Sequence, residues 1–146
     1  MSSSNPSTGP LSIVVVPAAV TLLVYVPELV TDAGQMAEVP APVRWAELAI
    51  LLCAAPAVAA VIARRARVRV DDRVAVVAGL AQLALAVLLV RIDVWIEVRS
   101  GYLLAGSGEE AMAYGLGTIA SVVGGLLLAT LVGLAARAGT RLAPTP

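Results

Sequence analysis

Four long apolar runs divide the chain, and short polar segments separate them. The runs cover about residues 11–30, 44–63, 74–98 and 108–136. An α-helix needs roughly 20 predominantly apolar residues to cross the ~30 Å hydrocarbon core of a bilayer. Because every run comes close to or exceeds that length, the pattern predicts an all-α integral membrane protein whose transmembrane helices form a four-helix, up-down bundle.

Both ends of the chain fall outside the apolar runs. Residues 1–10 are rich in Ser and Pro and carry no charged side chain, which is typical of a disordered tail. No Lys or Arg precedes the first run and no small-residue cleavage site follows it closely, so we interpret it as a span and not as a signal peptide. We expect a four-helix transmembrane domain over residues 11–137, with cytoplasmic tails at 1–10 and 138–146.

The composition agrees with a membrane location. Hydrophobic residues make up 60% of the chain and charged residues 14%, whereas soluble domains are about 45–50% apolar. The mean hydropathy is +0.93. Lys, His and Phe are absent while Ala, Val, Leu and Arg dominate, which we interpret as the coding bias of a GC-rich genome. We therefore expect a multi-pass protein of the cytoplasmic (inner) membrane of a bacterium.

Arginine residues are concentrated at one end of the predicted bundle. Seven of the ten lie between the second and third runs or after the fourth, namely Arg64, Arg65, Arg67, Arg69, Arg73, Arg137 and Arg141. The other three, Arg44, Arg91 and Arg99, lie at the opposite end. Basic residues close to span ends stay on the cytoplasmic side, so this asymmetry predicts that both termini are cytoplasmic (N-in, C-in).

Aromatic and acidic residues gather at the end with few arginines. The aromatic residues there are Tyr25, Trp45, Trp95, Tyr102 and Tyr114, and the acids are Glu28, Asp32, Glu38, Glu47, Asp93, Glu97, Glu109 and Glu110. Rings at this depth are typical of the belt at a membrane interface. We expect an acidic, aromatic outer mouth, and we take as candidate binding residues Tyr25, Trp45, Arg44, Arg91, Trp95 and Tyr114.

Few polar residues interrupt the spans themselves. Gln82 precedes Asp93 by eleven residues, which returns a helix to nearly the same angle, so we expect both on the side facing the bundle interior. Pro17 is expected to kink the first span, with neighbouring helices or Thr21 compensating for the backbone carbonyl that loses its donor. Cys53 is interpreted as a buried packing residue at mid-membrane.

The fourth span carries the strongest periodic signal. Small residues recur every four positions, at Ala113, Gly117, Ser121, Gly125, Ala129 and Gly133. Small side chains let another helix approach closely, so we expect a packing seam against other spans or a second copy, and regard a ligand groove as the alternative. Ser107 and Glu110 stand three residues apart where this run begins, and they predict a capping box there.

The residue inventory restricts cofactors and partners. One cysteine and no histidine leave none of the usual ligand sets for zinc or haem, so no metal and no cofactor are expected. A formal net charge of zero argues against a nucleic-acid partner. The expected partners are membrane lipid and either a second copy of the chain or another membrane protein.

Three functions are compatible with the outer mouth. The first is a non-enzymatic accessory, regulatory or binding protein. The second is a small membrane enzyme acting on a lipid or isoprenoid, with Glu28, Glu47, Asp93 or Glu97 as general acid and base. The third is a small dimeric transporter. No motif supports catalysis, and the spans hold no ionisable group near the midplane for transport, so the sequence favours the first.

Several short stretches also resemble a known family. They are Val26-Pro27-Glu28-Leu29, Pro40 and Pro42, Pro56 before the basic loop, and the last span from Ala120-Ser121-Val122-Val123 to Leu134-Ala135-Ala136-Arg137-Ala138. Over roughly residues 11–142 this arrangement resembles a family of small bacterial four-span membrane proteins of unassigned function. The resemblance implies the four-helix fold and a genomic setting near small helix-turn-helix regulators, and it names no functional residue.

Overall fold

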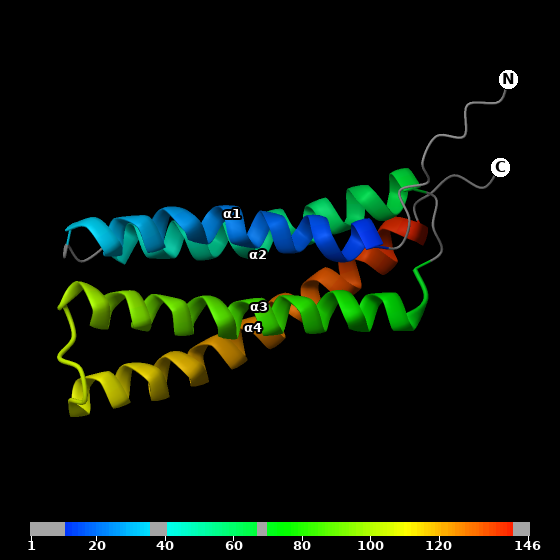
Figure 1. Cartoon of the computed structure of the whole chain (residues 1–146). Helices are drawn as coiled ribbons and strands as arrows, with labels where there is room; N and C mark the ends of the chain where they lie inside the picture. Colours follow the sequence, from blue (N-terminus) through cyan, green and yellow to red (C-terminus); the bar gives the residue numbers. More distant parts are fainter. Residues whose placement is uncertain (1–10, 36–40, 67–69, 142–146) are drawn as a thin grey trace, which may run out of the picture.

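Four α-helices make up nearly all of the described chain (Figure 1). The computed structural model describes residues 11–35, 41–66 and 70–141. Its helices are α1 (Leu11–Gln35), α2 (Ala41–Ala66), α3 (Asp72–Ser100) and α4 (Gly108–Arg141). Successive helices run in opposite directions, so α1 begins at the end of the bundle where α4 finishes. The predicted all-α, four-helix bundle is confirmed.

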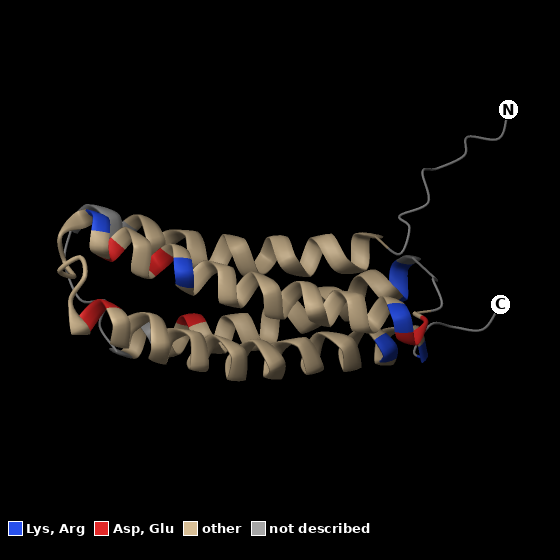
Figure 2. Cartoon of the chain, turned by 60° about the horizontal axis from the view of Figure 1, so that its bottom comes forward, with Lys and Arg blue, Asp and Glu red and all other residues tan. Residues whose placement is uncertain are grey.

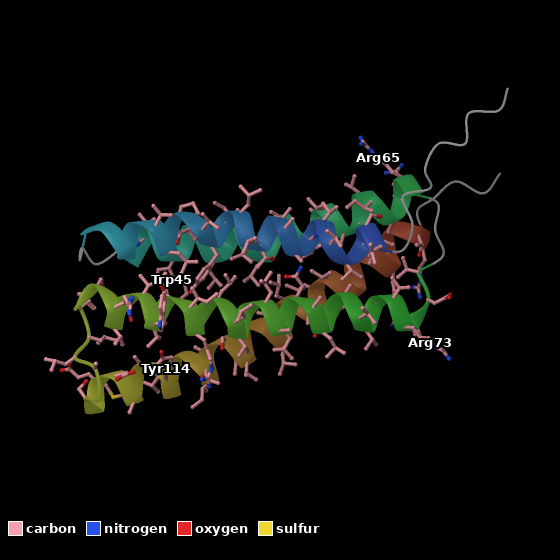
Figure 3. The ribbon with its side chains drawn as sticks, viewed as in Figure 1. Trp45, Arg65, Arg73 and Tyr114 are labelled. Atoms are coloured by element: carbon pink, nitrogen blue, oxygen red, sulfur yellow. The ribbon has the colours of Figure 1, made fainter. Side chains whose placement is uncertain are left out.

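The two ends of the bundle differ in charge (Figure 2) and in aromatic content. Arg65 and Arg73 lie at the end where α1 begins, and Trp45 and Tyr114 lie at the other end (Figure 3). We call these the arginine end and the aromatic end. The described residues that define them are Arg64, Arg65, Arg73, Arg137 and Arg141 for the first, and Trp45, Trp95, Tyr102 and Tyr114 for the second.

Each helix packs mainly against two others. Helix α1 contacts α2 and α3, and α4 contacts the same two helices, with the α3–α4 interface the most extensive. The order around the bundle is therefore α1, α2, α4, α3. This order places the consecutive helices α2 and α3 diagonally across the bundle.

Packing is closest in the half of the bundle toward the arginine end. The buried cluster there consists of Ile13, Ala55, Ala59, Ala63, Val70, Ala75, Ala78, Leu128, Val132 and Ala136. Most of these residues are alanines, and on α2 three of them recur at a spacing of four, which aligns them on one helix face. Small side chains let helix backbones come close, and in lipid such van der Waals packing drives helix association.

The small residues of α4 lie against α3. A Cβ atom added at Gly125 would lie 2.8 Å from Leu83 Cδ1 and 3.3 Å from Leu83 Cα. In the other direction, a Cβ atom on Gly79 of α3 would lie 3.3 Å from the backbone oxygen of Ala129. Two further members of the predicted seam, Gly117 and Gly133, lie against Val90 and Ala75.

A second close approach joins α4 to α2 at the arginine end. Gly139 is buried, and a Cβ atom there would collide with the backbone carbonyl oxygen of Ala60 and lie 3.0 Å from its Cα. The periodic pattern ended at Gly133, so the sequence did not single out this position. At Gly139 α4 therefore needs a residue without a side chain.

The helices extend beyond the apolar runs that predicted them. Helix α1 continues to Gln35 and α4 to Arg141, so residues 138–141, predicted as part of a tail, are helical. Hydropathy marks only the segment that lies in lipid, whereas a helix ends where its backbone hydrogen bonds end. Gly101 ends α3 with a φ of 83°, and the next backbone N–H donates to Glu97 O over 3.0 Å.

The start of α4 follows the predicted capping box in part. The backbone N–H of Glu110 donates to Ser107 Oγ over 3.2 Å, as expected of an N-cap serine. The Glu110 carboxylate, however, accepts a hydrogen bond from the N–H of Gly106 over 2.6 Å and not from that of Ser107. Gly106 has a φ of 72°, and this turn presents its N–H to the carboxylate.

The outer surface of the bundle is apolar, as in a membrane protein. Three segments are long and apolar enough to cross a membrane, Trp45–Arg65, Asp72–Ser100 and Gly108–Arg141, and the apolar part of α1, Leu11–Pro27, is shorter. Only 17 to 28% of the residues in their apolar windows are buried in the bundle. Most apolar side chains therefore face outward, which water would disfavour and lipid accommodates.

One position within the spans faces the opposite way from the prediction. Cys53 was expected to be buried, but it lies on the exposed face of α2. Ala55 and Ala59, two and six residues further on, occupy the buried face. The position of a residue along a span indicates its depth in the membrane. Its direction around the helix axis decides whether it contacts protein or lipid.

Candidate functional site

A cavity of about 230 Å³ lies inside the bundle and receives side chains from all four helices. Helix α1 contributes two residues and α2, α3 and α4 the rest: Thr21, Tyr25, Leu48, Leu51, Leu52, Ala86, Leu89, Val90, Ala120, Ser121, Gly124, Gly125 and Leu128. Most of these residues lie between the middle of the bundle and the aromatic end, and Leu128 also belongs to the buried cluster. The cavity therefore lies next to the alanine-rich cluster, on the side of the predicted mouth.

The position of the cavity follows from where large and small residues stand on α2 and α4. Toward the arginine end α2 presents alanines to the core, and Gly139 brings α4 against it. Toward the aromatic end α2 presents Leu48, Leu51 and Leu52 instead. Helix α4 runs obliquely across the bundle (Figure 1), and at this level a Cβ atom added at Gly124 would meet no other atom within 4 Å. The leucines keep α2 at a distance from α4, and Gly124 on α4 has no side chain to fill the space between them.

Two lining residues on the adjacent helices α2 and α4 reach the outer surface of the bundle. Leu48 is 43% exposed and Ala120 is also exposed, and both line the cavity. Leu89 and Leu128, at 3% and 5% exposure, form its deeper wall. A molecule in the surrounding lipid could therefore enter sideways without passing through the aqueous mouth.

Two hydroxyl groups on the wall, those of Thr21 and Ser121, use their hydrogens within the protein. Thr21 Oγ1 lies 2.8 Å from Gln82 Oε1 and 3.1 Å from the backbone oxygen of Pro17. Ser121 Oγ donates to the backbone oxygen of Thr118 over 2.9 Å. Neither hydroxyl has a second hydrogen to offer a ligand. Since the rest of the wall is mainly hydrocarbon, the cavity suits an apolar guest.

The Thr21–Gln82 hydrogen bond also ties α1 to α3 in the core. Gln82 is 1% exposed and Thr21 2%, so the prediction that Gln82 faces the interior is confirmed. Thr21 does not compensate for Pro17 in the way expected, because the carbonyl that Pro17 leaves without a donor is that of Ile13. Thr21 bonds to the oxygen of Pro17, which is its own i−4 carbonyl.

The size of the cavity restricts what it holds. Pockets for drug-sized molecules are typically about 300–1,000 Å³, so a cavity of about 230 Å³ takes only part of such a molecule. Apolar cavities of about 150 Å³ stay dry and bind benzene-sized guests. The dimensions therefore fit a segment of a hydrocarbon chain, or a small apolar ring, better than a polar headgroup.

The predicted mouth residues do not converge on one point. Tyr25 lines the cavity. Tyr114 is half-buried, with the Arg91 guanidinium carbon 5.7 Å from its ring centre. Trp45 and Trp95 are 69% and 55% exposed and belong to the outer surface, which is where an interfacial aromatic belt lies. Arg99 lies over the Trp95 ring at 5.7 Å, so Arg91 and Arg99 both make cation–π contacts.

The candidate acid and base residues lie away from the cavity wall. Glu47, Asp93 and Glu97 are half-buried, and none of them lines the cavity. Asp93 and Glu97 both have interaction partners. The side chains of Glu28 and Arg44 lie outside the described part of the structure. Within the described residues, no group of three Cys, Asp or Glu side chains is arranged to hold a metal ion.

The α4 seam residues contribute both to packing and to the cavity. Gly125 and Ser121 are buried and line the cavity as well as lying on α4 near α3. Ala129 and Gly133 lie against α3 closer to the arginine end. The stripe that was predicted as a packing seam therefore also borders the internal cavity.

Most of the cavity wall was not identified from the sequence. The residues that sequence reasoning missed are Leu48, Leu51, Leu52, Ala86, Leu89, Val90, Ala120, Gly124 and Leu128. A usable signal was the pair Gly124-Gly125, in which consecutive glycines point in different directions on a helix and so cannot both serve one interface.

No family model, curated protein or solved structure matches this chain.

Proposed function

We propose that this chain is a non-enzymatic membrane protein that binds a hydrocarbon chain of a lipid or isoprenoid in the cavity between its four helices. The guest enters from the bilayer between α2 and α4, and its polar end lies toward the aromatic end. A protein of this kind acts as an accessory or regulatory component whose state depends on the bound lipid.

The observation that carries this proposal is the chemistry of the cavity wall. It is made mainly of leucine, valine, alanine and glycine, and the hydroxyls of Thr21 and Ser121 donate their hydrogens within the protein. An apolar guest gains about 25 cal/mol for each Å² of apolar surface that it buries when it leaves water. A guest that arrives from lipid gains less, so its selection depends on fit and on the position of its polar end.

The enzyme alternative would place its reaction elsewhere. General acid–base catalysis needs a proton-transferring group within about 2.6–3.2 Å of the reacting atom. Among the described residues of the cavity wall, the only polar side chains are Thr21, Tyr25 and Ser121. Glu47, Asp93 and Glu97 lie outside the wall, so the cavity supports binding better than turnover.

A photoactivatable fatty acid tests the binding site directly. Palmitic acid with a diazirine in its chain is added to vesicles containing the protein, and crosslinked residues are mapped by mass spectrometry. Leu89 and Leu128 are nearly inaccessible from outside but line the cavity, so crosslinks to them report a chain inside. We expect Gly124→Leu to reduce these crosslinks about tenfold, because the added side chain fills the cavity.

Gly115→Leu is the matched control for this experiment. A Cβ atom at Gly115 also meets nothing within 4 Å, but Gly115 is exposed and does not line the cavity. Crosslinks to Leu89 and Leu128 should then persist. Absence of those crosslinks in the unmodified protein would refute binding in the cavity, and recovery of a chemically altered lipid would favour an enzyme.

We further propose that the arginine end faces the cytoplasm of a bacterium and that the protein spans its inner membrane four times. Arg64, Arg65, Arg73, Arg137 and Arg141 stand at this end, and the acids Asp71 and Asp72 offset only part of their charge. Arg67 and Arg69 lie outside the described residues. A surplus of arginine next to span ends is retained on the cytoplasmic side during insertion.

Cysteine accessibility measures this orientation. In a Cys53→Ala background, a cysteine introduced by Ala105→Cys in the α3–α4 connection should react with a membrane-impermeant maleimide on intact cells. One introduced by Val68→Cys, between α2 and α3, should react only after the cells are permeabilised. Labelling of both or neither on intact cells would contradict four crossings in this direction, and labelling of Val68→Cys alone would invert it.

A further inference from the structure

A groove of about 300 Å³ runs along the outside of the bundle between α3 and α4, separate from the internal cavity. It is lined by Ala75, Val76, Gly79, Leu80, Leu83, Leu126, Ala129, Thr130, Gly133, Leu134 and Arg137. The small residues that bring the two helices together form its floor, and large side chains form its rims. Leu80, Leu126 and Leu134 on these rims are 52 to 58% exposed.

The groove ends at a polar pocket on the arginine end. This pocket, of about 380 Å³, is lined by Val70, Asp72, Arg137, Thr140 and Arg141, and it shares Arg137 with the groove. The apolar groove and the polar pocket therefore meet at the guanidinium of Arg137. That combination matches the two parts of a phospholipid, an acyl chain and a phosphate.

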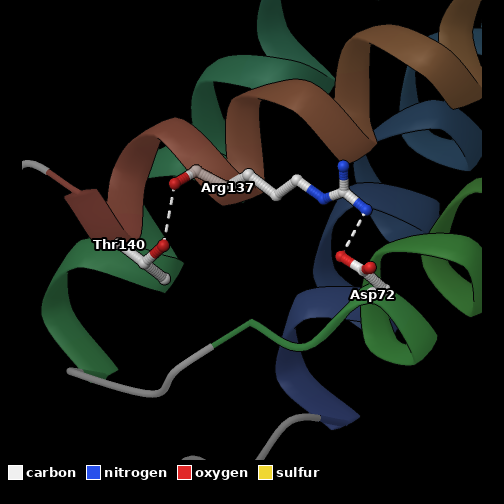
Figure 4. Close-up of polar contacts among 3 residues, drawn as sticks. All are labelled: Asp72, Arg137 and Thr140. Atoms are coloured by element: carbon white, nitrogen blue, oxygen red, sulfur yellow. Dashed lines mark hydrogen bonds and ion pairs between the residues drawn. The ribbon is translucent and has the colours of Figure 1, made fainter.

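Arg137 is held in place at the junction (Figure 4). Its Nη2 donates to Asp72 Oδ1 over 2.6 Å, and its backbone oxygen accepts a hydrogen bond from Thr140 Oγ1 over 2.7 Å. Its Nε is buried and has no hydrogen-bond partner among the described residues. One edge of the guanidinium is thus fixed by α3, and the Arg137 side chain, which is 42% exposed, remains accessible to a ligand.

The length of the groove corresponds to one leaflet. From Leu126 to Arg137 is eleven residues along α4, or about 16 Å at a rise of 1.5 Å per residue. Half of the hydrocarbon core of a bilayer is about 15 Å. An acyl chain whose phosphate rests at Arg137 would therefore reach the middle of the membrane where the groove ends.

We propose that this groove and pocket bind one anionic phospholipid from the leaflet at the arginine end. Its phosphate binds Arg137 and Arg141, and one acyl chain lies between α3 and α4. The two guanidiniums and the Asp72 carboxylate leave the pocket one positive charge. Thr140 uses its hydrogen on Arg137, so the arginines supply the donors. This site is independent of the internal cavity.

The same charge disfavours a second copy of the chain as the occupant. In a two-fold symmetric dimer formed side by side along this groove, the same surface of both subunits meets itself. The arginine ends of both copies would then lie together, each with an excess of guanidinium groups. An anionic lipid removes that repulsion, whereas a second copy adds to it.

Native mass spectrometry of the protein released from vesicles of phosphatidylglycerol and phosphatidylcholine in equal amounts tests the proposal. We expect one retained phosphatidylglycerol per chain and about a tenfold preference over phosphatidylcholine. Arg141→Gln removes a phosphate donor at an exposed helix end, and Thr130→Trp fills the groove. Each should lower retention about fivefold or more, and the controls Arg65→Gln and Leu127→Trp, at exposed positions outside both linings, should leave it unchanged.

The remaining outcomes overturn the proposal. Equal retention of the two lipids would mean that the pocket does not select an anionic headgroup. An equal loss of phosphatidylglycerol retention with Arg65→Gln would mean that the lipid is attracted to the whole arginine end and not to this pocket. A dimer in the mass spectrum that Thr130→Trp converts to a monomer, with lipid retention unchanged, would assign the groove to a second copy. Arg141→Gln leaves the packed helices untouched, so it reports on binding even if Thr130→Trp fails to fold.

Discussion

Gly125→Leu is expected to lower the free energy of unfolding in detergent by about 3 kcal/mol or more, because it forces apart two helices in the middle of the bundle. A Cβ atom at Gly125 would already lie 3.2 Å from Ala86 Cβ and 3.3 Å from Leu83 Cα. The three further carbons of leucine can extend into the adjoining cavity only after α3 has moved to admit the Cβ atom. Neither helix ends nearby, so fraying cannot relieve the overlap, and unfolding titrations in mixed micelles measure the loss.

The neighbouring glycine provides a matched control. Gly124→Leu makes the same chemical change one residue away, but a Cβ atom at Gly124 meets nothing within 4 Å because it borders the cavity. We expect its free energy of unfolding to be equal to that of the unmodified protein or higher, because leucine forms helices more readily than glycine and adds contacts. Equal losses for both substitutions would mean that α4 does not pack on α3 through Gly125.

Gly139→Ala is expected to cost about 2 kcal/mol, a large effect for a single added methyl group. The new Cβ atom would collide with the backbone oxygen of Ala60 and lie 3.0 Å from its Cα. Backbone atoms cannot rotate away as side chains do, so α2 and α4 must separate or the last turn of α4 must unwind. Unwinding of this last turn limits the loss of unfolding free energy, because Gly139 lies only two residues before the end of α4.

Gly115→Ala separates this steric effect from the general effect of replacing a helical glycine. No atom lies within 4 Å of a Cβ at Gly115, and in a helix alanine is favoured over glycine by about 1 kcal/mol in water. The Gly115→Ala variant should therefore be as stable as the unmodified protein or more stable. If Gly139→Ala were equally harmless, the contact between α2 and α4 at Ala60 would be absent from the folded protein.

The bundle packs tightly toward the arginine end and contains the cavity toward the aromatic end. This division lets the proposed guest bind while the protein stays folded. The alanine cluster and Gly139 hold α2 and α4 together at the arginine end. The cavity lies at the other end, where the same two helices are lined by leucines and by Gly124. Stability and binding therefore rest largely on different residues, although Gly125 contributes to both.

Helix number and the end of the bundle to which a residue belongs could be predicted from the sequence. Apolar runs of lipid length identified each helix, and the distribution of arginine and aromatic residues placed them at opposite ends of the bundle. The angular relation between Gln82 and Asp93 correctly indicated which face of α3 looks inward. These properties depend on composition and on the 3.6-residue period, which are local features of the chain.

The candidate site could be predicted only in part. Tyr25 and Ser121 were singled out and do line the cavity, but Trp45 and Trp95 at a similar depth lie on the outer surface. Depth along the membrane normal is readable from the chain, whereas the direction of a side chain around its helix depends on which neighbours the helix has. In a protein whose outside is as apolar as its inside, hydropathy does not distinguish the two.

The sequence by itself determined that this is a helical membrane protein with a basic end and an aromatic end, since lipid admits only segments of the right length and charges stay at its surfaces. Only the tertiary structure decided that α4 packs between α2 and α3, and hence where the internal cavity and the outer groove lie. The physical reason is that small residues permit close approach without specifying a partner. The partner is selected by the fit of whole helix surfaces, as at Gly125 against α3 and Gly139 against α2.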